Sequence, residues 1–127
     1  MITNFEDYTA ELTDYERDMV VPMLVELLMT RVGSKNAIRN KEICRIFKGK
    51  GFDVSEARIR KCINYIRMSK DRKTHVPHLI ASSKGYYRAT SVAQVQVYGE
   101  SLEQRASAIM AVRNALLDDL TGLLFIA

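Results

Sequence analysis

The last third of the chain constrains the fold most, because it has the pattern of one long helix. No proline occurs from Ser91 to the end of the sequence. Ser91 and Gln94 have the spacing of a helix-initiating capping box, and helical sequence continues to about Leu120. About 28 residues of helix are ~42 Å long at 1.5 Å per residue, which is more than a small domain needs. We therefore predict a long C-terminal helix within residues 91–127.

Apolar residues recur along this helix at intervals of seven, a spacing typical of helices that pair. Gly99 weakens the helix locally, and Arg105 and Arg113 interrupt an ideal apolar seam. The apolar stripe either folds back onto the first helix or pairs with a second copy of the chain. The apolar tail over residues 120–127 favours association, so we expect a homodimer formed through this helix. The repeating positions are Val95, Leu102, Ile109, Leu116 and Leu123.

The charges of the 127-residue chain are unevenly distributed. Sixteen of its nineteen Lys and Arg residues lie between Arg31 and Arg88, with only four of its fifteen acidic residues. This segment therefore carries a formal charge of +12, although the whole chain carries only +4. Such a block repels itself and is tolerated best when a polyanion neutralises it, which makes nucleic acid the leading candidate partner. The alternative is a solvated basic face that binds nothing.

Residues 1–12 are expected to form an N-terminal tail, and helical patterns begin after it. Thr13 and Glu16 have the spacing of a second capping box, and apolar residues at helical intervals continue to about Gly33. Pro22 lies inside this stretch and lacks the N–H that would bond residue 18. We therefore expect one helix with a bend at Pro22, followed by a loop over 33–36.

A pair of helices and a hairpin are predicted next. Asn40 is a plausible N-cap for a helix over 41–50, and Ser55 for a helix over 55–70. Residues 79–89 predict two short strands joined by a tight turn, in which Gly85 supplies a positive φ. The fold class is thus mainly α with a small β-hairpin: a winged helix-turn-helix over 13–90, followed by the long C-terminal association helix.

The second helix of the pair, residues 55–70, is the candidate recognition helix. Its isoleucines and Cys62 form a narrow apolar stripe, and 100° per residue puts amide and cationic side chains on the opposite face and flanks. Arg bidentate to guanine and Asn bidentate to adenine are the commonest base-reading contacts, and the DNA major groove is wide enough to admit a helix. The predicted base-contacting residues are Arg58, Arg60, Lys61 and Asn64.

Other basic residues are assigned to the phosphate backbone, where contacts fix the register of the protein without reading sequence. Most of them surround the first helix of the pair, and one is at the tip of the hairpin, which would act as the wing. The predicted phosphate-contacting residues are Lys35, Arg39, Lys41, Arg45, Arg67, Lys73 and Lys84.

The order of elements, with the stretch from Leu79 to Thr90 leading into a long helix, resembles small winged-helix proteins encoded by phages and prophages, those of gut Bacteroidetes in particular. The stretch from Arg58 to Arg67 resembles the recognition helix of that group. The resemblance covers about residues 12–120. It implies double-stranded DNA binding in regulation or in phage replication, and it transfers no catalytic residues.

Several other classes of protein are disfavoured. No apolar run approaches the roughly 20 residues that span a bilayer, and the acidic N-terminus is not a secretory signal. Cys44 and Cys62 are predicted to be reduced, buried thiols, which fits a cytoplasmic protein. No catalytic, metal or cofactor pattern is present, and no small-molecule substrate is expected. Two alternatives to duplex binding stay open: a protein-interaction module on a winged-helix scaffold, and an RNA or single-strand binder.

Overall fold

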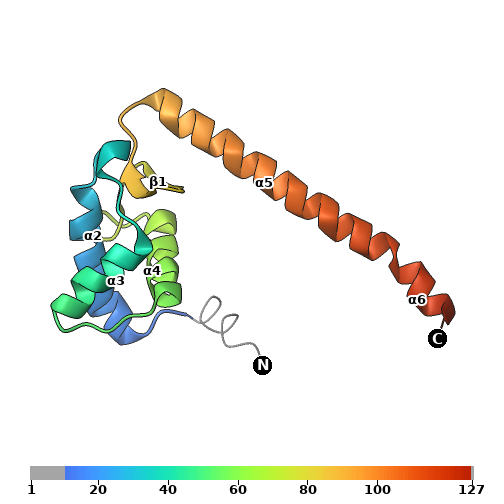
Figure 1. Cartoon of the computed structure of the whole chain (residues 1–127), viewed down its shortest axis with the longest axis horizontal. Coiled ribbons are helices and arrows are strands. Elements are labelled where there is room, and N and C mark those ends of the chain that lie inside the picture. Colours follow the sequence, from blue (N-terminus) through green and yellow to red (C-terminus); the bar gives the residue numbers. More distant parts are fainter. Residues whose placement is uncertain (1–10, 127) are drawn as a thin grey trace. The chain divides into compact units, whose positions relative to one another are not determined.

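The computed structural model describes residues 11–126. As predicted, the chain is mainly helical, with a small two-stranded antiparallel sheet and a long C-terminal helix (Figure 1). It divides into two compact units, Met1–Thr90 and Ser91–Ala127. Of the predicted tail over residues 1–12, the first ten residues lie outside the described part of the chain.

The first unit begins with a helical run that changes its winding before Pro22. The capping box is confirmed: the Thr13 N–H donates to the Glu16 carboxylate at 2.9 Å, and the Glu16 N–H donates to Thr13 Oγ1 at 3.1 Å. A wide π-helical segment, η1 (Glu16–Val20), leads directly into α2 (Val21–Met29), and Pro22 lies in the first turn of α2. Where a bend at Pro22 was expected, the helix has a π-helical turn just before the proline. This wider turn accommodates the missing proline N–H.

The helix pair is α3 (Asn40–Gly49) and α4 (Glu56–Met68). The prediction that Asn40 caps the first of these helices is wrong, because Asn40 is itself the first helical residue and Arg39 occupies the cap position without a side-chain bond. Instead, the Asn40 side-chain amide donates to the Glu56 carbonyl at 3.0 Å and joins the starts of the two helices. Ser55 does cap α4, since its Oγ accepts the Arg58 N–H at 3.2 Å.

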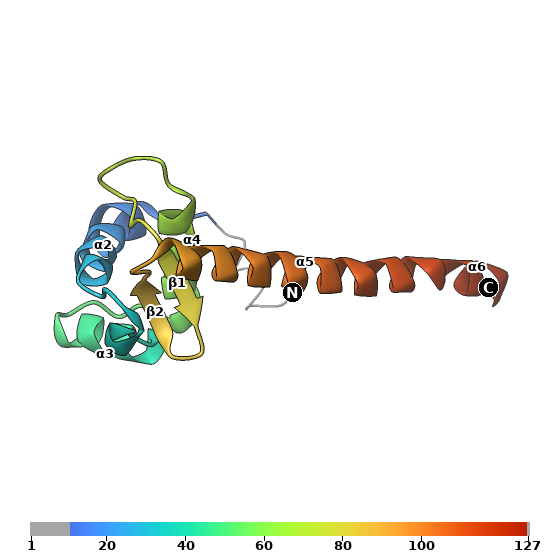
Figure 2. The same ribbon diagram turned by 90° about the horizontal axis from the view of Figure 1, so that it is seen from above.

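The sheet is a hairpin of β1 (Leu79–Ser82) and β2 (Gly85–Arg88), visible as paired arrows in Figure 2. The chain on either side of the predicted loop over 33–36 pairs with the outer edge of β2, through bridges at Val32 and Ile38. The backbones of Ile38 and Tyr86 exchange two hydrogen bonds of 3.0 and 2.8 Å, and the Gly33 N–H donates to the Arg88 carbonyl at 2.9 Å. The hairpin is thereby tied to the chain between α2 and α3.

Gly85 is required where these segments meet. It has a φ of +118°, as predicted for the turn, and a Cβ at this position would lie 2.4 Å from the Ile38 carbonyl oxygen. Only a residue without a side chain permits both the conformation and the close approach of the two backbones.

One apolar core joins α2, α3, α4 and the start of β1. Each helix contributes residues spaced by three and four, as expected for faces that bury one stripe. The most buried of these side chains, each 2% exposed or less, are Val20, Val21, Leu24, Leu28, Ile38, Ile43, Phe47, Ile59, Cys62, Ile63, Ile66 and Val76.

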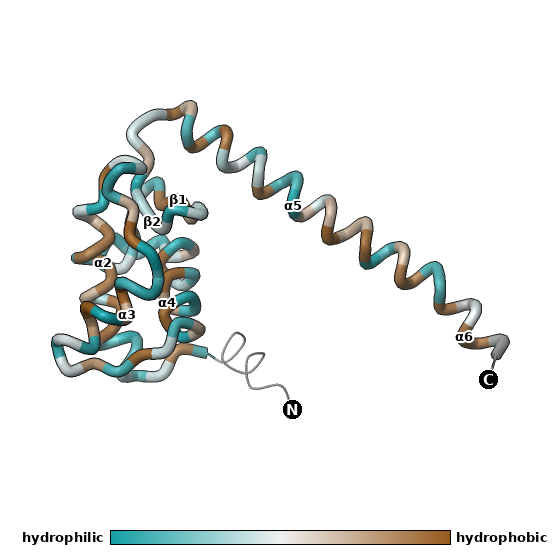
Figure 3. Tube along the Cα trace, in the orientation of Figure 1, coloured by the Kyte–Doolittle hydropathy of each residue, from teal (hydrophilic) through white to brown (hydrophobic). Residues whose placement is uncertain are grey.

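The second unit consists of α5 (Val92–Asp118) and the short α6 (Leu120–Ile126). The predicted cap is confirmed, because Ser91 Oγ accepts the Gln94 N–H at 3.2 Å. Figure 3 shows apolar residues recurring along this unit, and no residue of α5 is buried in the described structure. Within residues 11–126, no helix combines the length and the apolar character needed to cross a bilayer.

Candidate nucleic-acid interface

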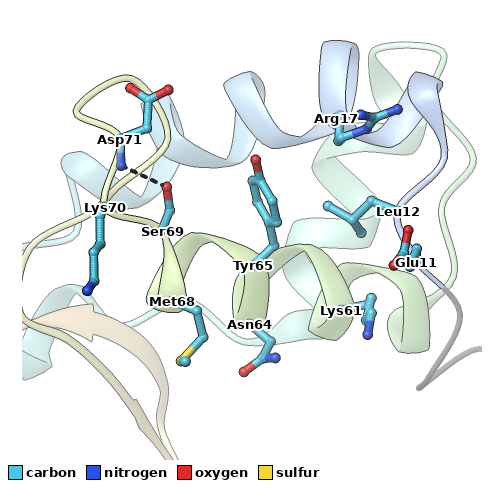
Figure 4. Close-up of a pocket in the computed structure, with 10 residues that line it drawn as sticks. All are labelled: Glu11, Leu12, Arg17, Lys61, Asn64, Tyr65, Met68, Ser69, Lys70 and Asp71. Atoms are coloured by element: carbon cyan, nitrogen blue, oxygen red, sulfur yellow. Dashed lines mark hydrogen bonds between the residues drawn. The ribbon is translucent and has the colours of Figure 1, made fainter.

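The buried stripe of α4 determines which of its side chains face solvent. Ile59, Cys62, Ile63 and Ile66 are all 2% exposed or less, as the spacing predicts. At 100° per residue the opposite side of the helix carries Lys61, Asn64 and Met68. Asn64 is exposed, Lys61 is half-buried and Met68 is 75% exposed. These side chains extend from the same side of α4 in Figure 4.

An open groove of about 680 Å³ runs beside this face. One wall is the α4 surface, with Lys61, Asn64, Tyr65 and Met68, and the other includes Leu12 (Figure 4). The groove is therefore lined by cationic, amide, aromatic and thioether groups together with the carboxylates of Glu11 and Asp71, so its charge is mixed.

Arg58 does not belong to this face. Its guanidinium forms a two-pronged ion pair with Glu16, in which Nε donates to Oε2 at 2.7 Å and Nη2 donates to Oε1, and Nη2 also donates to the Glu11 carbonyl at 3.2 Å. Its side chain is 16% exposed and that of Glu16 is 7% exposed. The prediction that Arg58 reads a base is not supported, because the side chain is turned toward the N-terminal helix.

The ion pair changes the ionisation of Glu16. The hydrogen bond from Arg58 lowers the pKa of the Glu16 carboxyl below its ordinary value, against the opposing effect of burial. Glu16 is thus held as a carboxylate, and it accepts bonds from both the first helical turn and α4. Together with the buried stripe, the pair restrains the rotation of α4 about its axis.

Arg60 lies on the other flank of α4 and stays exposed. Its Nη2 is 3.8 Å from Glu56 Oε1, and both side chains are more than 40% exposed. An exposed pair of this kind contributes little and is easily exchanged for another partner. Arg60 is therefore available to an external anion in a way that Arg58 is not.

Most of the predicted phosphate-contacting residues are exposed, so their charges are accessible. Arg39 and Lys41 flank the start of α3, and Lys84 is in the hairpin turn, where its N–H donates to Ser82 Oγ at 3.2 Å. Arg67, on α4, is half-buried. The exposed members of the set are Lys35, Arg39, Lys41, Arg45, Lys73 and Lys84.

One basic residue has a structural role that sequence reasoning missed. Arg88 donates from Nε to the Pro77 carbonyl at 3.3 Å and from Nη1 to the Met29 carbonyl at 3.2 Å. It therefore connects the end of β2 to the end of α2. A long-range contact to a backbone carbonyl leaves no trace in residue spacing, and only the position of Arg88 at a strand end hinted at a structural use.

The two cysteines are not activated for chemistry. Burial is the main cause that raises the pKa of both thiols, that of Cys62 to about 12. Both therefore remain protonated near neutral pH, where a nucleophilic or metal-binding thiolate is not formed.

Comparison of the chain with protein-family models, with curated proteins and with solved structures gave no match.

Proposed function

We propose that residues 13–90 form a winged helix-turn-helix domain that binds double-stranded DNA, with α4 in the major groove and the hairpin β1–β2 as the wing. The observation that carries the proposal is the outward side of α4. It presents Lys61 and Asn64, with Arg60 on the flank, in the most cationic segment of the chain. Amide and cationic groups of this kind form the most specific hydrogen bonds to base edges.

In this proposal the reading residues are Arg60, Lys61 and Asn64. Asn64 donates to and accepts from the two exposed groups of an adenine edge, and Lys61 or Arg60 donates to the two acceptors of a guanine. The Glu16–Arg58 ion pair and the buried isoleucines hold α4 in a fixed rotation. Fixed rotation is what a base reader needs, because each bidentate contact depends on the angle at which the side chain leaves the helix.

The remaining exposed cations would position the domain. Lys35, Arg39, Lys41 and Arg45 come from the segment before α3 and from α3 itself, and Lys84 comes from the hairpin turn. Each phosphate neutralised releases condensed counterions, so the affinity should fall steeply with salt. Lys84 at the wing would contact the backbone or the minor groove beside the helix.

A role without catalysis, as a phage-type regulator or replication accessory, is consistent with this arrangement. A partner-docking module is the second candidate function, and one observation favours it. Met68 and Tyr65 are 75% and 39% exposed on the same part of α4, which gives the helix some apolar surface. The cations nearby favour DNA over an apolar partner, and the two proposals differ in their response to salt.

The test measures binding of fluorescent duplex, single-stranded DNA and RNA by anisotropy at several salt concentrations, after selection of a preferred duplex from a random pool. Asn64→Ala should lose about 1–3 kcal/mol of discrimination between the preferred and a scrambled duplex. Lys84→Ala should weaken binding to all duplexes alike and reduce the slope of log K against log salt by about 1.

Arg105→Ala is the matched control, since it removes one exposed cation from α5 and should leave both quantities unchanged. Absence of duplex binding by the wild type would overturn the proposal. Equal effects of Asn64→Ala, Lys84→Ala and Arg105→Ala would overturn the assignment of α4 as the reading helix.

A further inference from the structure

The apolar side chains of α5 are exposed along the whole length of the helix. Val95 and Leu102 are 39% and 40% exposed, and Ile109 and Leu116 are 68% and 64% exposed. They recur every seven residues, so they form one column along the helix. The helix has 27 residues, and none of them is buried in the described structure. An exposed apolar column of this length is typical of a surface that binds another protein.

A second column lies beside the first and differs from it in size. Residues four positions after each member of the large column share its face of the helix. These are Gly99, Ala106 and Arg113 within α5, and Leu120 at the start of α6. With these positions the seam of α5 consists of a column of large side chains beside a column that is small in its first half and holds Arg113 in its second half, while Arg105, three residues after Leu102, lies on the opposite flank.

We infer that α5 pairs with α5 of a second copy of this chain in the antiparallel direction. This direction brings large side chains of one helix against Gly99 and Ala106 of the other, which reduces the voids in the seam. The layers within α5 are Gly99 opposite Leu116, Leu102 opposite Arg113, and Ala106 opposite Ile109 of the second copy, each occurring twice by symmetry.

The parallel direction fits the same columns poorly. It would bring Gly99 against Gly99 and Ala106 against Ala106 of the second copy. These layers would contain voids, because the large residues of the neighbouring layers keep the two helices apart. It would also bring Arg113 against Arg113, two like charges within an apolar seam. Size and charge therefore both favour the antiparallel pair.

Charge complementarity supports the same register. The acidic residue nearest the seam is Glu103, which is exposed and adjacent in sequence to Leu102, the residue opposite Arg113. In the antiparallel pair the Arg113 guanidinium reaches Glu103 of the second copy while its stem covers Leu102. In the isolated chain Arg113 donates only to its neighbour Asn114, at 3.1 Å, among the bonds found in the described structure.

Sedimentation velocity at tens of micromolar tests the pairing, and the wild type should be a dimer. Glu103→Arg should weaken self-association by about tenfold or more, because the introduced guanidinium would meet Arg113 of the second copy, twice by symmetry. Combining Glu103→Arg with Arg113→Glu in one chain should restore the dimer, since the opposite charges are exchanged. Glu100→Arg makes the same charge change on the far side of the helix and should leave the dimer intact.

Cysteine cross-linking tests the direction, in a Cys44→Ser background that keeps only the buried native thiol of Cys62. Gly99→Cys and Leu116→Cys should form a disulfide when the two variants are mixed. Neither should cross-link alone, because two copies of position 99 would be about 25 Å apart along the antiparallel pair at 1.5 Å per residue.

A wild-type monomer would overturn the inference, and so would cross-linking of Gly99→Cys with itself, which would indicate the parallel pair. If Glu103→Arg left the strength of self-association unchanged, the proposed register would be overturned. None of these outcomes depends on whether residues 13–90 bind DNA, so the two proposals can fail separately.

Discussion

The two units of this chain use apolar residues at helical spacing in opposite ways. In α2, α3 and α4 the stripe of each helix is covered by its neighbours, and residues such as Leu24, Phe47 and Ile63 are 2% exposed or less. In α5 the stripe is as regular, yet Ile109 and Leu116 are more than 60% exposed. Periodicity alone therefore identifies a helix with a face, and it does not say whether the chain itself covers that face.

The difference follows from helix length and neighbours. The helices of the first unit have nine to thirteen residues, so three of them surround one small core. The 27 residues of α5 present a seam far longer than such helices could cover. The first unit thus gains its stability from internal packing, whereas the stripe of α5 gains stability only from another chain or from a contact that covers it.

A Leu→Ala substitution should affect the free energy of unfolding very differently in the two units, and this is the largest difference that we expect. Leu24→Ala creates a cavity in the core and should lower the free energy of unfolding of the first unit by about 2–5 kcal/mol. Leu116→Ala removes an exposed side chain and should leave that free energy unchanged, while it weakens self-association. The unfolding free energies of the two variants are measured by urea denaturation followed by circular dichroism. A chain truncated after Thr90 is the reference for the first unit. Equal losses in the two variants would contradict the comparison.

Local patterns predicted the elements of the first unit well. The Thr13–Glu16 and Ser55 caps, the buried stripe of α4 and the positive φ of Gly85 follow from residues within four positions of one another, and all are confirmed. The main fold class was accessible for the same reason. Each of these features is a local hydrogen bond or a local periodicity, which sequence spacing encodes directly.

Contacts between distant parts of the chain were not accessible in this way. Arg58 pairs with Glu16, 42 residues away, and Arg88 reaches the Met29 carbonyl, 59 residues away. The bridge between Ile38 and Tyr86 likewise joins residues 48 positions apart and was not predicted. The outward position of Asn64 was thus predicted, whereas the pairing of Arg58 with Glu16 was not, because a flank residue faces solvent or a neighbour depending on what packs beside it.

Two glycines distinguish a position fixed by packing from one that is not. Gly85→Ala combines a strained φ of +118° with a Cβ 2.4 Å from the Ile38 carbonyl oxygen, so it should cost at least about 2 kcal/mol of unfolding free energy. Gly49, at the end of α3, has nothing within 4 Å of such a Cβ and no positive φ. Gly49→Ala should be neutral or stabilise by up to about 1 kcal/mol. Thermal unfolding of the two variants measures this difference. A Gly85→Ala variant as stable as the wild type would contradict the close approach of the two backbones.

The Glu16–Arg58 pair should make the first unit sensitive to acid. Since the folded-state pKa of Glu16 lies below its ordinary value of 4.5, the pair stabilises the fold fully above that pH, and the stabilisation is lost as the pH falls through the lowered pKa. Arg58→Met leaves a buried carboxylate without its partner and should cost about 2–3 kcal/mol at pH 7. Glu16→Gln should flatten the loss of stability below pH 4.5.

Arg17 pairs with the exposed Asp14, so Asp14→Asn is the matched control for the acid dependence. Its carboxylate is solvated, and the variant should keep the wild-type curve of unfolding free energy against pH. An identical acid dependence in Glu16→Gln and in Asp14→Asn would mean that the buried pair does not stabilise the fold.

The two serine caps give the smallest contrast, and the cleanest one. Ser55 and Ser91 accept the same N–H bond at the same distance of 3.2 Å, so Ser→Ala removes identical chemistry at each site. Ser55→Ala should lower the unfolding free energy of the first unit by about 1 kcal/mol, because α4 is built into its core. Ser91→Ala should only fray the first turn of α5, seen as faster amide hydrogen exchange over residues 92–95, with the first unit unchanged. If Ser91→Ala destabilised the first unit as much as Ser55→Ala, the start of α5 would have to fold together with residues 13–90, and the comparison between the two units would no longer hold.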